Sequence, residues 1–507
     1  MKNQSIPITL IILTVISVLL GICLRLFQLQ EHVIWHDEVH TILRAMGATT
    51  NEFTDEMFDG KIHSGSELQK YQKLDPQKKF KDTLRALASH PEHSPLYFLF
   101  VRLISPFFDS PIIGARFLSA LISLFLFPAI FLLTKMLFPQ YKTAPFIALC
   151  LLSLSPLQIL YAREARQYAL FEVMVIVATF QFLKACQNDR GWGWYGVTLA
   201  VGLYTHLIFC LLIITHGCFL SSIARYRIRW LGLFKSVFIA GICFSPWIWI
   251  IISGIMNLQK HTAWMHIPLP LSLIVFGWIR HIHHILFDLP NFTELQWISI
   301  PLILICFFYT MLKGNRKTAI ILGLSISLNI VPLVIPDLIA GGQRSMETRY
   351  FLQALLFLHL CVVFFFAYIV EKSKHLQWLG YSMIVGLLVG TGFFGNCYFN
   401  TDTWWNKRTS INNPKTARII NTAPNPLVIS KVAANSPGEV LSLSYLVDPK
   451  TRFLLLPANQ IQTVSLPKSY NIFLFSPSWD LLKELRHEYN LSPIADTKES
   501  LWGQTPS

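Results

Sequence analysis

The sequence predicts a polytopic α-helical membrane protein that ends in a small α/β domain. Of its 507 residues, 53% are hydrophobic and only 14% are charged, which is far from the composition of a soluble protein. Apolar runs near the ~20 residues needed to cross hydrocarbon begin at Ile6 and recur to about Gly395. From about Tyr398 the chain changes to short strand-like runs bounded by Pro, Asn and Gly. We therefore predict a transmembrane domain, residues 1–397, and an extracytoplasmic α/β domain, residues 398–507.

Eleven apolar runs are candidate transmembrane helices, and basic connectors between them support this count. The first run lacks a small-residue cleavage site after it, so we expect it to stay as a helix rather than be removed as a signal peptide. The predicted crossings are Ile6–Phe27, Ile112–Thr134, Thr143–Tyr161, Tyr168–Cys186, Gly193–Tyr204, Leu207–Ile223, Leu231–Ile252, Trp297–Leu312, Thr318–Ile335, Tyr350–Val370 and Leu376–Phe394. Five short basic connectors then fall on the side of the amino terminus, as the positive-inside rule requires. They are Lys135 with Lys142, Lys184 with Arg190, Arg225/Arg227/Arg229, Lys313/Arg316/Lys317 and Lys372/Lys374.

Two further apolar segments, residues 94–108 and 271–289, would invert every later connector if each crossed once. We therefore interpret both as re-entrant or interfacial. The second contains "RHIHH", residues 280–284, a costly set of polar groups at hydrocarbon depth. This topology leaves the loop 28–93, the segment 253–296 and the tail on the outer face.

The tail is expected to contain four strands and a helix. The strand candidates are "NPLVIS", "EVLSLSYLV", "RFLLLP" and "YNIFLFSPS". The helix candidate is "WDLLKELRHEY", in which Leu482, Leu485 and Tyr489 share a face and Ser478 can cap the start.

The formal net charge of +14 lies mainly in the short connectors between apolar runs. That distribution favours anionic lipid head groups or a lipid phosphate as partners and argues against nucleic acid. The nine cysteines are scattered, and all but Cys397 lie in apolar runs, so they form neither a disulfide framework nor a thiol metal site.

An acidic pair, Asp37 and Glu38, lies about ten residues after the first helix. A carboxylate at the lipid–water boundary can take a proton from an acceptor hydroxyl, as general-base catalysis requires. The plainer alternative is a solvated acidic loop, since eleven acids lie between Gln28 and His93.

A second cluster, "YAREARQYAL", occupies the outer end of the third predicted crossing. Arg163, Glu164 and Arg166 follow an apolar helix, and helical spacing would place the two arginines on one face. Such a helix end can hold a phosphate, with Tyr168 closing the cluster. The alternative is an interfacial anchor that snorkels to the membrane surface.

Further cations lie on the outer face according to this topology. Arg344 and Arg349 occur in "GGQRSMETRYF", Arg116 lies near the outer end of the second crossing, and His93 follows His90 in "HPEHSPLYF". Guanidinium forks suit phosphate oxygens. Each alone can be a membrane anchor, but together they predict an outer-face basin for a lipid-borne phosphate.

At these residues the sequence resembles the GT-C membrane glycosyltransferases, in particular the protein O-mannosyltransferase and aminoarabinose transferase group with its rhizobial lipopolysaccharide glycosyltransferase-like members. The matching elements are "WHDEVHT", "HPEHSPLYFLFVRL", "GARFLSALISLFLFPAIFLLTKMLF", "SPLQILYAREARQYAL", "LYTHLIF" and "ETRYFLQALLF". The first five cover roughly residues 30–220 in order. The tail carries no signature of the family.

The resemblance implies a polyprenyl-phosphate sugar donor, a hydroxyl acceptor on a glycan, lipid or protein, and transfer on the non-cytoplasmic face of a bacterial-type inner membrane. Asp37 matches the family's catalytic acid, Glu38 its companion, and Glu164 the second acidic position. Arg349 matches a cation near the lipid phosphate, and we favour His93 over His90 as the motif histidine. No cofactor is required, although carboxylates with phosphate oxygens suit Mg²⁺ or Mn²⁺. We expect residues 37 and 164 to share a cavity open to lipid.

A lipid-linked sugar flippase or transporter is the main alternative. Transporters usually place ionisable groups near the bilayer midplane and contain internal repeats. In this sequence the notable charges lie at helix ends and the two halves show no similarity. A ligase that moves a whole lipid-linked glycan would share the topology, and a receptor reading explains neither acidic site.

Overall fold

The computed structural model describes residues 6–289, 293–372, 374–433, 435–458, 469–494, 497 and 500–504. The chain forms two compact units. The first, the helical unit, comprises residues 1–27, 90–97 and 116–397, and the second, the mixed unit, comprises 28–89, 98–115 and 398–507. The mixed unit thus contains the predicted tail domain together with most of the loop 28–93.

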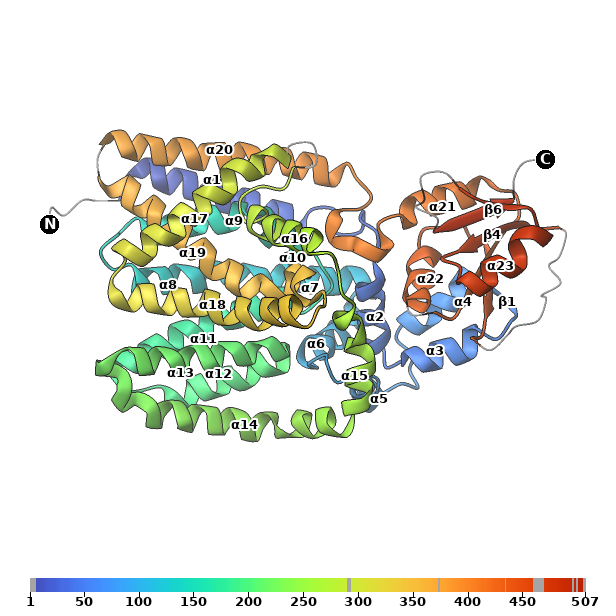
Figure 1. The fold of residues 1–507 in the computed structure, drawn as a ribbon, viewed down its shortest axis with the longest axis horizontal. Coiled ribbons are helices and arrows are strands. Elements are labelled where there is room, and N and C mark those ends of the chain that lie inside the picture. Colours follow the sequence, from blue (N-terminus) through green and yellow to red (C-terminus); the bar gives the residue numbers. More distant parts are fainter. Residues whose placement is uncertain are drawn as a thin grey trace. The chain divides into compact units, whose positions relative to one another are not determined.

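The helical unit is a bundle of long apolar helices (Figure 1). Among the described residues, eight helices are long and apolar enough to cross a membrane, or up to ten if each of two bent pairs is one span. The long helices are α1 (Ile8–Leu26), α7 with α8 (Pro111–Leu124 and Leu126–Leu137), α11 (Tyr168–Asn188), α14 (Trp230–Ser253, preceded by η4), α17 (Gln296–Lys313), α18 (Arg316–Ile339), α19 (Thr348–Lys372) and α20 (Lys374–Phe399). This architecture confirms the predicted polytopic helical class.

The prediction of eleven crossings differs from this count at three places. The runs 193–204 and 207–223 form α12 (Trp192–Thr205), η3 (Leu207–Phe209) and α13 (Cys210–Ser222), of which α12 has 14 residues and α13 has 13. Helices of that length are too short to cross ~30 Å of hydrocarbon at 1.5 Å per residue. The third predicted crossing is a broken pair, α9 (Ala144–Leu154) and α10 (Pro156–Ala162), bent by 63°.

The predicted re-entrant segments correspond to short or bent helices. Residues 94–108 form α6 (Leu96–Ile104) and η2 (Ser105–Phe107). Residues 271–289 contain α16 (Leu271–His283), which together with α15 (Ile255–Thr262) and η5 (Ala263–His266) makes a pair bent by 99°. The polar "RHIHH" set is largely buried in protein: His281 contacts the Ser345 carbonyl and the Thr348 hydroxyl, and His283 contacts the Ser299 hydroxyl.

Helix α19 lies at the centre of the bundle. Its most apolar 18-residue window is 89% buried, against 22–67% for the other long helices. It packs against α9, α11, α17 and α18. Its charged first turn is therefore held in place by helices on several sides.

The mixed unit is built on a six-stranded sheet of order β1-β3-β2-β4-β6-β5. The inner strands β3 (Arg452–Leu456), β2 (Pro426–Lys431) and β4 (Asn471–Phe475) run parallel. The outer strands β1 (Ile62–Ser64), β6 (Leu501–Gln504) and β5 (Leu491–Pro493) pair antiparallel. Strand β1 comes from the first loop, where Ile62 pairs with Leu454, so the sheet needs both parts of the chain.

Helices cover both faces of this sheet. They include α2 (His36–Ala45), α3 (Thr50–Met57), α4 (Gly65–Gln69), η1 (Lys70–Gln72), α5 (Phe80–Ala88), η8 (Trp405–Ser410), α21 (Asn413–Thr422), α22 (Ser436–Ser444) and α23 (Trp479–Glu488). Val428, Phe453 and Phe473 face one apolar core, and Leu427, Leu454 and Leu474 face the other. This alternation is expected of strands with both faces covered.

One predicted strand in the tail is wrong. "EVLSLSYLV" lies largely in helix α22, because Ser436-Pro437 starts a helical turn and Leu441, Ser442, Leu443 and Ser444 are all buried. The Leu–Ser alternation imitates the two-residue period of a half-buried strand. The other three strands and helix α23 form as predicted, and Ser478 is the N-cap residue of α23, although its side chain makes no capping hydrogen bond.

Candidate functional site

A turn between α10 and α11 contains the second predicted cluster. Helix α10 ends at Ala162, Arg163 is its C-cap, and α11 begins at Tyr168. Residues 164–167 therefore form a turn, and the prediction that Arg163 and Arg166 share a helical face is wrong. The break before α10 is fixed because the Ser155 hydroxyl donates to the Ile285 carbonyl at 2.8 Å.

Arg163 anchors this turn to the first helix. Its guanidinium donates to the carbonyls of Leu24 at 2.7 Å and Phe27 at 2.6 Å. The end of α1 supplies these carbonyls because the last residues of a helix have no partner within it. We infer that Arg163 positions the turn.

Glu164, Arg166 and Arg349 are brought together around two aromatic side chains. Tyr161 interacts electrostatically with Glu164 and Arg349. His206, in the bend after α12, interacts electrostatically with Arg166 and Arg349. All three charged side chains come from the ends of α10, α11 and α19, so residues about 185 positions apart share one buried basin. We call these five residues the turn cluster.

Burial makes the turn cluster a strong electrostatic environment. Glu164 is 1% exposed and Arg166 is 3% exposed. Arg349 pairs with Glu347 at 3.0 Å, and the Arg166 guanidinium lies 5.7 Å from the Tyr168 ring centre. Charges in such a low-dielectric setting interact more strongly than they would in water. Two guanidinium groups here are suited to an anionic ligand.

The other predicted cations occupy different positions. Arg116 is a buried residue of α7 in the helical unit. Arg344 pairs with Asp337 at 2.7 Å and contacts the His266 ring, so it joins the end of α18 to η5. His93 lies 3.8 Å from Glu92.

Asp37 and Glu38 lie in the first turn of α2, in the mixed unit. Glu38 is fully buried, accepts a 3.4 Å hydrogen bond from the Trp35 amide and lies 3.7 Å from the Lys407 ammonium. This is a capping box, in which the side chain satisfies an amide at the helix start. Asp37 is partly exposed at the same helix end. Because Asp37 and Glu164 belong to different units, the expectation that they share a cavity remains a prediction.

A possible metal site lies in the helical unit and was not predicted. Ligand atoms of His90, Glu92 and His261 all lie within 4.8 Å of one another. His90 contacts Glu92 at 3.1 Å, and the His90 and His261 ring centres are 3.9 Å apart. Two imidazoles and a carboxylate form a ligand set that Zn²⁺ commonly uses. The residues fit a divalent cation of this kind better than Mg²⁺, which prefers oxygen ligands.

Sequence reasoning missed Tyr161, His206 and His261 as site residues. Tyr161 and His206 lie inside the quoted motifs "YAREARQYAL" and "LYTHLIF", so the motifs pointed to the region. His261 had no such signal, because about 170 residues separate it from His90 and only the bent pair α15–α16 brings it back.

Comparison with known proteins identifies the class of protein. Residues 89–250 match the family model described as dolichyl-phosphate-mannose-protein mannosyltransferase. The structure of ArnT from Cupriavidus metallidurans bound to undecaprenyl phosphate matches with a TM-score of 0.54 and 11% identity, covering 98% of this chain and 99% of that chain. The chain is a membrane glycosyltransferase of the GT-C class.

The glycosyltransferase matches other solved structures as well. ArnT from the same organism in the apo state gives a TM-score of 0.53 at 12% identity, covering 98% of this chain and 99% of that one. The oligosaccharyltransferase of Archaeoglobus fulgidus gives 0.49 at 11% identity, covering 88% of this chain and 62% of that one, a likeness too distant to support an inference. No curated protein matches the glycosyltransferase by sequence.

These findings confirm the predicted class and fold, and they leave the residue roles as proposals. The matched segment 89–250 contains His93, Arg116, the turn 163–168 and His206. Asp37, Glu38, Arg344 and Arg349 lie outside it.

Proposed function

We propose that this glycosyltransferase moves a sugar from a polyprenyl-phosphate donor to an acceptor hydroxyl on the extracytoplasmic face of the cell membrane. The turn cluster carries the proposal: two arginines and a glutamate, almost fully buried, meet between the ends of membrane-spanning helices. Guanidinium groups at such a depth suit the phosphate of a lipid carrier. The ArnT structure bound to undecaprenyl phosphate supports a lipid phosphate as the ligand of this fold.

The reaction we propose is a single displacement at the anomeric carbon. The acceptor oxygen attacks that carbon while its proton passes to the Asp37 carboxylate. The bond from the anomeric carbon to the phosphate oxygen breaks, and its electron pair leaves with polyprenyl phosphate. Arg166 and Arg349 stabilise the departing phosphate, so the configuration inverts and no separate general acid is required.

Glu164, Arg116, Tyr168, His93 and Arg344 complete the proposed substrate-binding set. Glu164, which interacts with Tyr161, fixes the turn that presents Arg166. A Mg²⁺ or Mn²⁺ ion near the carboxylates could assist phosphate binding but is not needed for the displacement.

The test is release of polyprenyl phosphate from a panel of polyprenyl-phosphate sugars by the purified protein. We expect Asp37→Asn to lower the turnover by roughly 10²–10⁴-fold, the usual contribution of a general base. Asp55→Asn is a matched control, because Asp55 is an exposed acid of the same unit. Equal turnover in the Asp37 variant and the control would refute the assignment of the base.

Arg349→Lys separates binding from chemistry. It keeps the charge but loses the planar fork, so we expect a weaker donor interaction with the same pH profile. Unchanged donor binding would show that the lipid phosphate is held elsewhere.

A further inference from the structure

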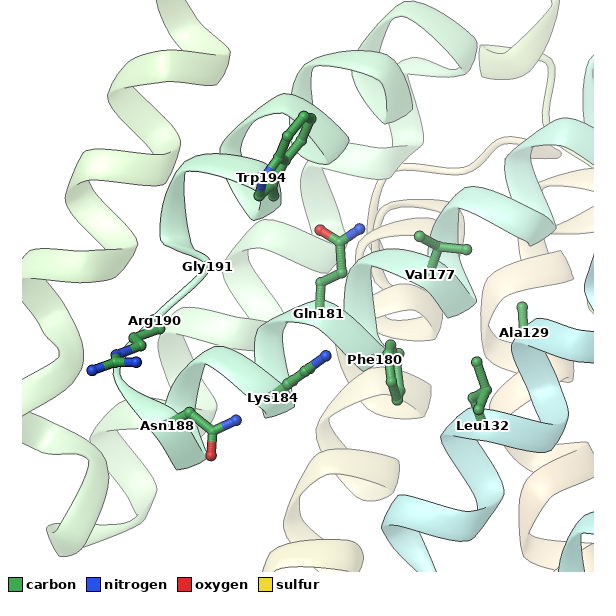
Figure 2. A pocket seen from close by; sticks show the side chains of 10 residues that line it. All are labelled: Ala129, Leu132, Val177, Phe180, Gln181, Lys184, Asn188, Arg190, Gly191 and Trp194. Carbon is green, nitrogen blue, oxygen red and sulfur yellow. The ribbon is translucent and has the colours of Figure 1, made fainter.

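A groove on the helical unit lies away from the turn cluster, at the loop that joins α11 to α12. Its volume is about 920 Å³, and its walls come from α8, α11 and the start of α12 (Figure 2). Leu132, Val177 and Phe180 line its apolar part, whereas Lys184, Asn188 and Arg190 line its polar part. A cavity of this size is large enough for a drug-sized portion of a ligand.

The α11 wall changes along its length from apolar to cationic. Val177, Phe180, Gln181, Lys184 and Asn188 line the groove and recur at intervals of three or four residues, so they lie on one helical face. Figure 2 shows these side chains along one side of the space, with Trp194 of α12 on another. From Val177 to Lys184 the rise is ~10 Å. The groove therefore has an apolar end and a charged end, like an amphiphile.

The two cations of the groove are not engaged in ion pairs in the part of the chain that the structure describes. Asp189, the acid adjacent to Arg190, instead pairs with Arg229 and accepts a hydrogen bond from the Trp192 indole at 3.2 Å. Lys184 and Arg190 are both exposed, and Trp194 is 76% exposed. Exposed Trp with Lys and Arg is the composition of the membrane–water interface.

We propose that this groove binds a two-chain anionic phospholipid of the surrounding bilayer. The phosphate contacts Lys184 and Arg190, and the first part of the acyl chains lies along Phe180, Val177 and Leu132. Lys184 and Arg190 form one of the five basic connectors, which predict the leaflet rich in anionic lipid. A glycerophospholipid is the occupant because the reaction-site carrier is placed by the proposed function at the opposite helix ends.

The test uses native mass spectrometry of the full-length protein released from detergent with phosphatidylglycerol or phosphatidylcholine. We expect the wild type to retain phosphatidylglycerol and to prefer it over phosphatidylcholine. Each Lys or Arg contact with an anionic lipid supports binding, so the double variant Lys184→Ala/Arg190→Ala should weaken phosphatidylglycerol retention by roughly tenfold or more. Ala129→Trp, which fills the apolar end, should reduce retention without a change of charge.

The matched control is Arg225→Ala/Arg316→Ala, which removes two exposed cations from other basic connectors. Equal loss in the control and the groove variant would mean that only net charge matters and would overturn the proposal. Displacement of phosphatidylglycerol by an equimolar polyprenyl phosphate would assign the groove to the carrier lipid and would also overturn it. Because lipid retention is measured without turnover, the result does not depend on the proposed reaction.

Discussion

At the scale of single residues, neighbouring acids in "WHDEVHT" have different surroundings. Glu38 is buried, bonded to the Trp35 amide and close to Lys407, whereas Asp37 is partly exposed. We therefore expect Glu38 to act as a positioning residue that fixes the start of α2. Its effect on turnover, if this is so, follows from a lost fold at that helix end.

Glu38→Gln should lower the thermal stability of the protein. The substitution leaves the Lys407 ammonium buried without its carboxylate, which costs about 1–3 kcal/mol. Thermal unfolding followed by tryptophan fluorescence measures the loss, and Asp37→Asn serves as the neighbouring comparison with a small expected shift. A Glu38→Gln protein of unchanged stability but lost turnover would restore Glu38 as a direct participant in catalysis.

The cluster of His90, Glu92 and His261 should bind Zn²⁺. Metal analysis of the purified protein after zinc addition and gel filtration should give about one ion per chain. His261→Ala should remove the ion, whereas His375→Ala should not, because His375 is an exposed histidine of α20 outside the cluster. Equal zinc content in the two variants would exclude the cluster as a metal site.

Glu52 gives the mixed unit a dependence on acid. Partial burial by itself raises the pKa of Glu52, but hydrogen bonds from the Lys78 ammonium and the Thr49 amide, and the charges of Lys78 and Arg85, lower that pKa overall. A carboxyl whose folded pKa is depressed stabilises the protein above its unfolded pKa and loses that contribution as the pH falls. The stability difference between wild type and Glu52→Gln should therefore be present at pH 7 and disappear below about pH 4. A difference that stays constant over this range would contradict the charged interaction.

At the scale of elements, the packing of α12 against α14 depends on small residues. A Cβ added at Gly232 would lie 2.2 Å from the Trp192 ring, and one added at Gly196 would lie 2.9 Å from the Ser236 carbonyl. Small residues allow such close approach of helices in a membrane. The 14-residue α12 is thus held by contact with its neighbour rather than by its own length.

Gly232→Ala should destabilise the helical unit by about 1–3 kcal/mol, as overpacking of a close contact usually does. Gly241→Ala is the control on the same helix, because an added Cβ there meets nothing within 4 Å. Both changes raise helix propensity equally, so their difference isolates packing. Thermal unfolding in detergent measures it, and equal unfolding temperatures would refute the packing argument.

At the scale of the whole molecule, the basic connectors define the orientation of the chain. Figure 1 shows the ends of α8, α11, α13, α17 and α19 near the amino terminus. These are the helix ends that the five basic connectors follow, so we expect them to be cytoplasmic. The α10–α11 turn would then lie on the outer face.

Reporter fusions test this orientation. Alkaline phosphatase fused after Gly314 should be inactive because it stays in the cytoplasm, whereas a fusion after Gln504 should be active. A cytoplasmic reporter, such as green fluorescent protein, should give the inverse pattern at the same two sites. The reverse result would place the tail in the cytoplasm and would contradict the proposed face of the reaction.

The sequence by itself determined the polytopic helical class, the family resemblance and most long helices, because apolar length and charge asymmetry are local properties of the chain. It also located three strands and α23 in the tail. Local alternation misled it at α22, where Leu and Ser are equally buried. Tertiary structure alone decided that Arg163 holds the end of α1, that β1 completes the sheet, and that His261 meets His90 and Glu92. Each of these depends on contacts between distant segments, which packing and burial select and which no local pattern encodes.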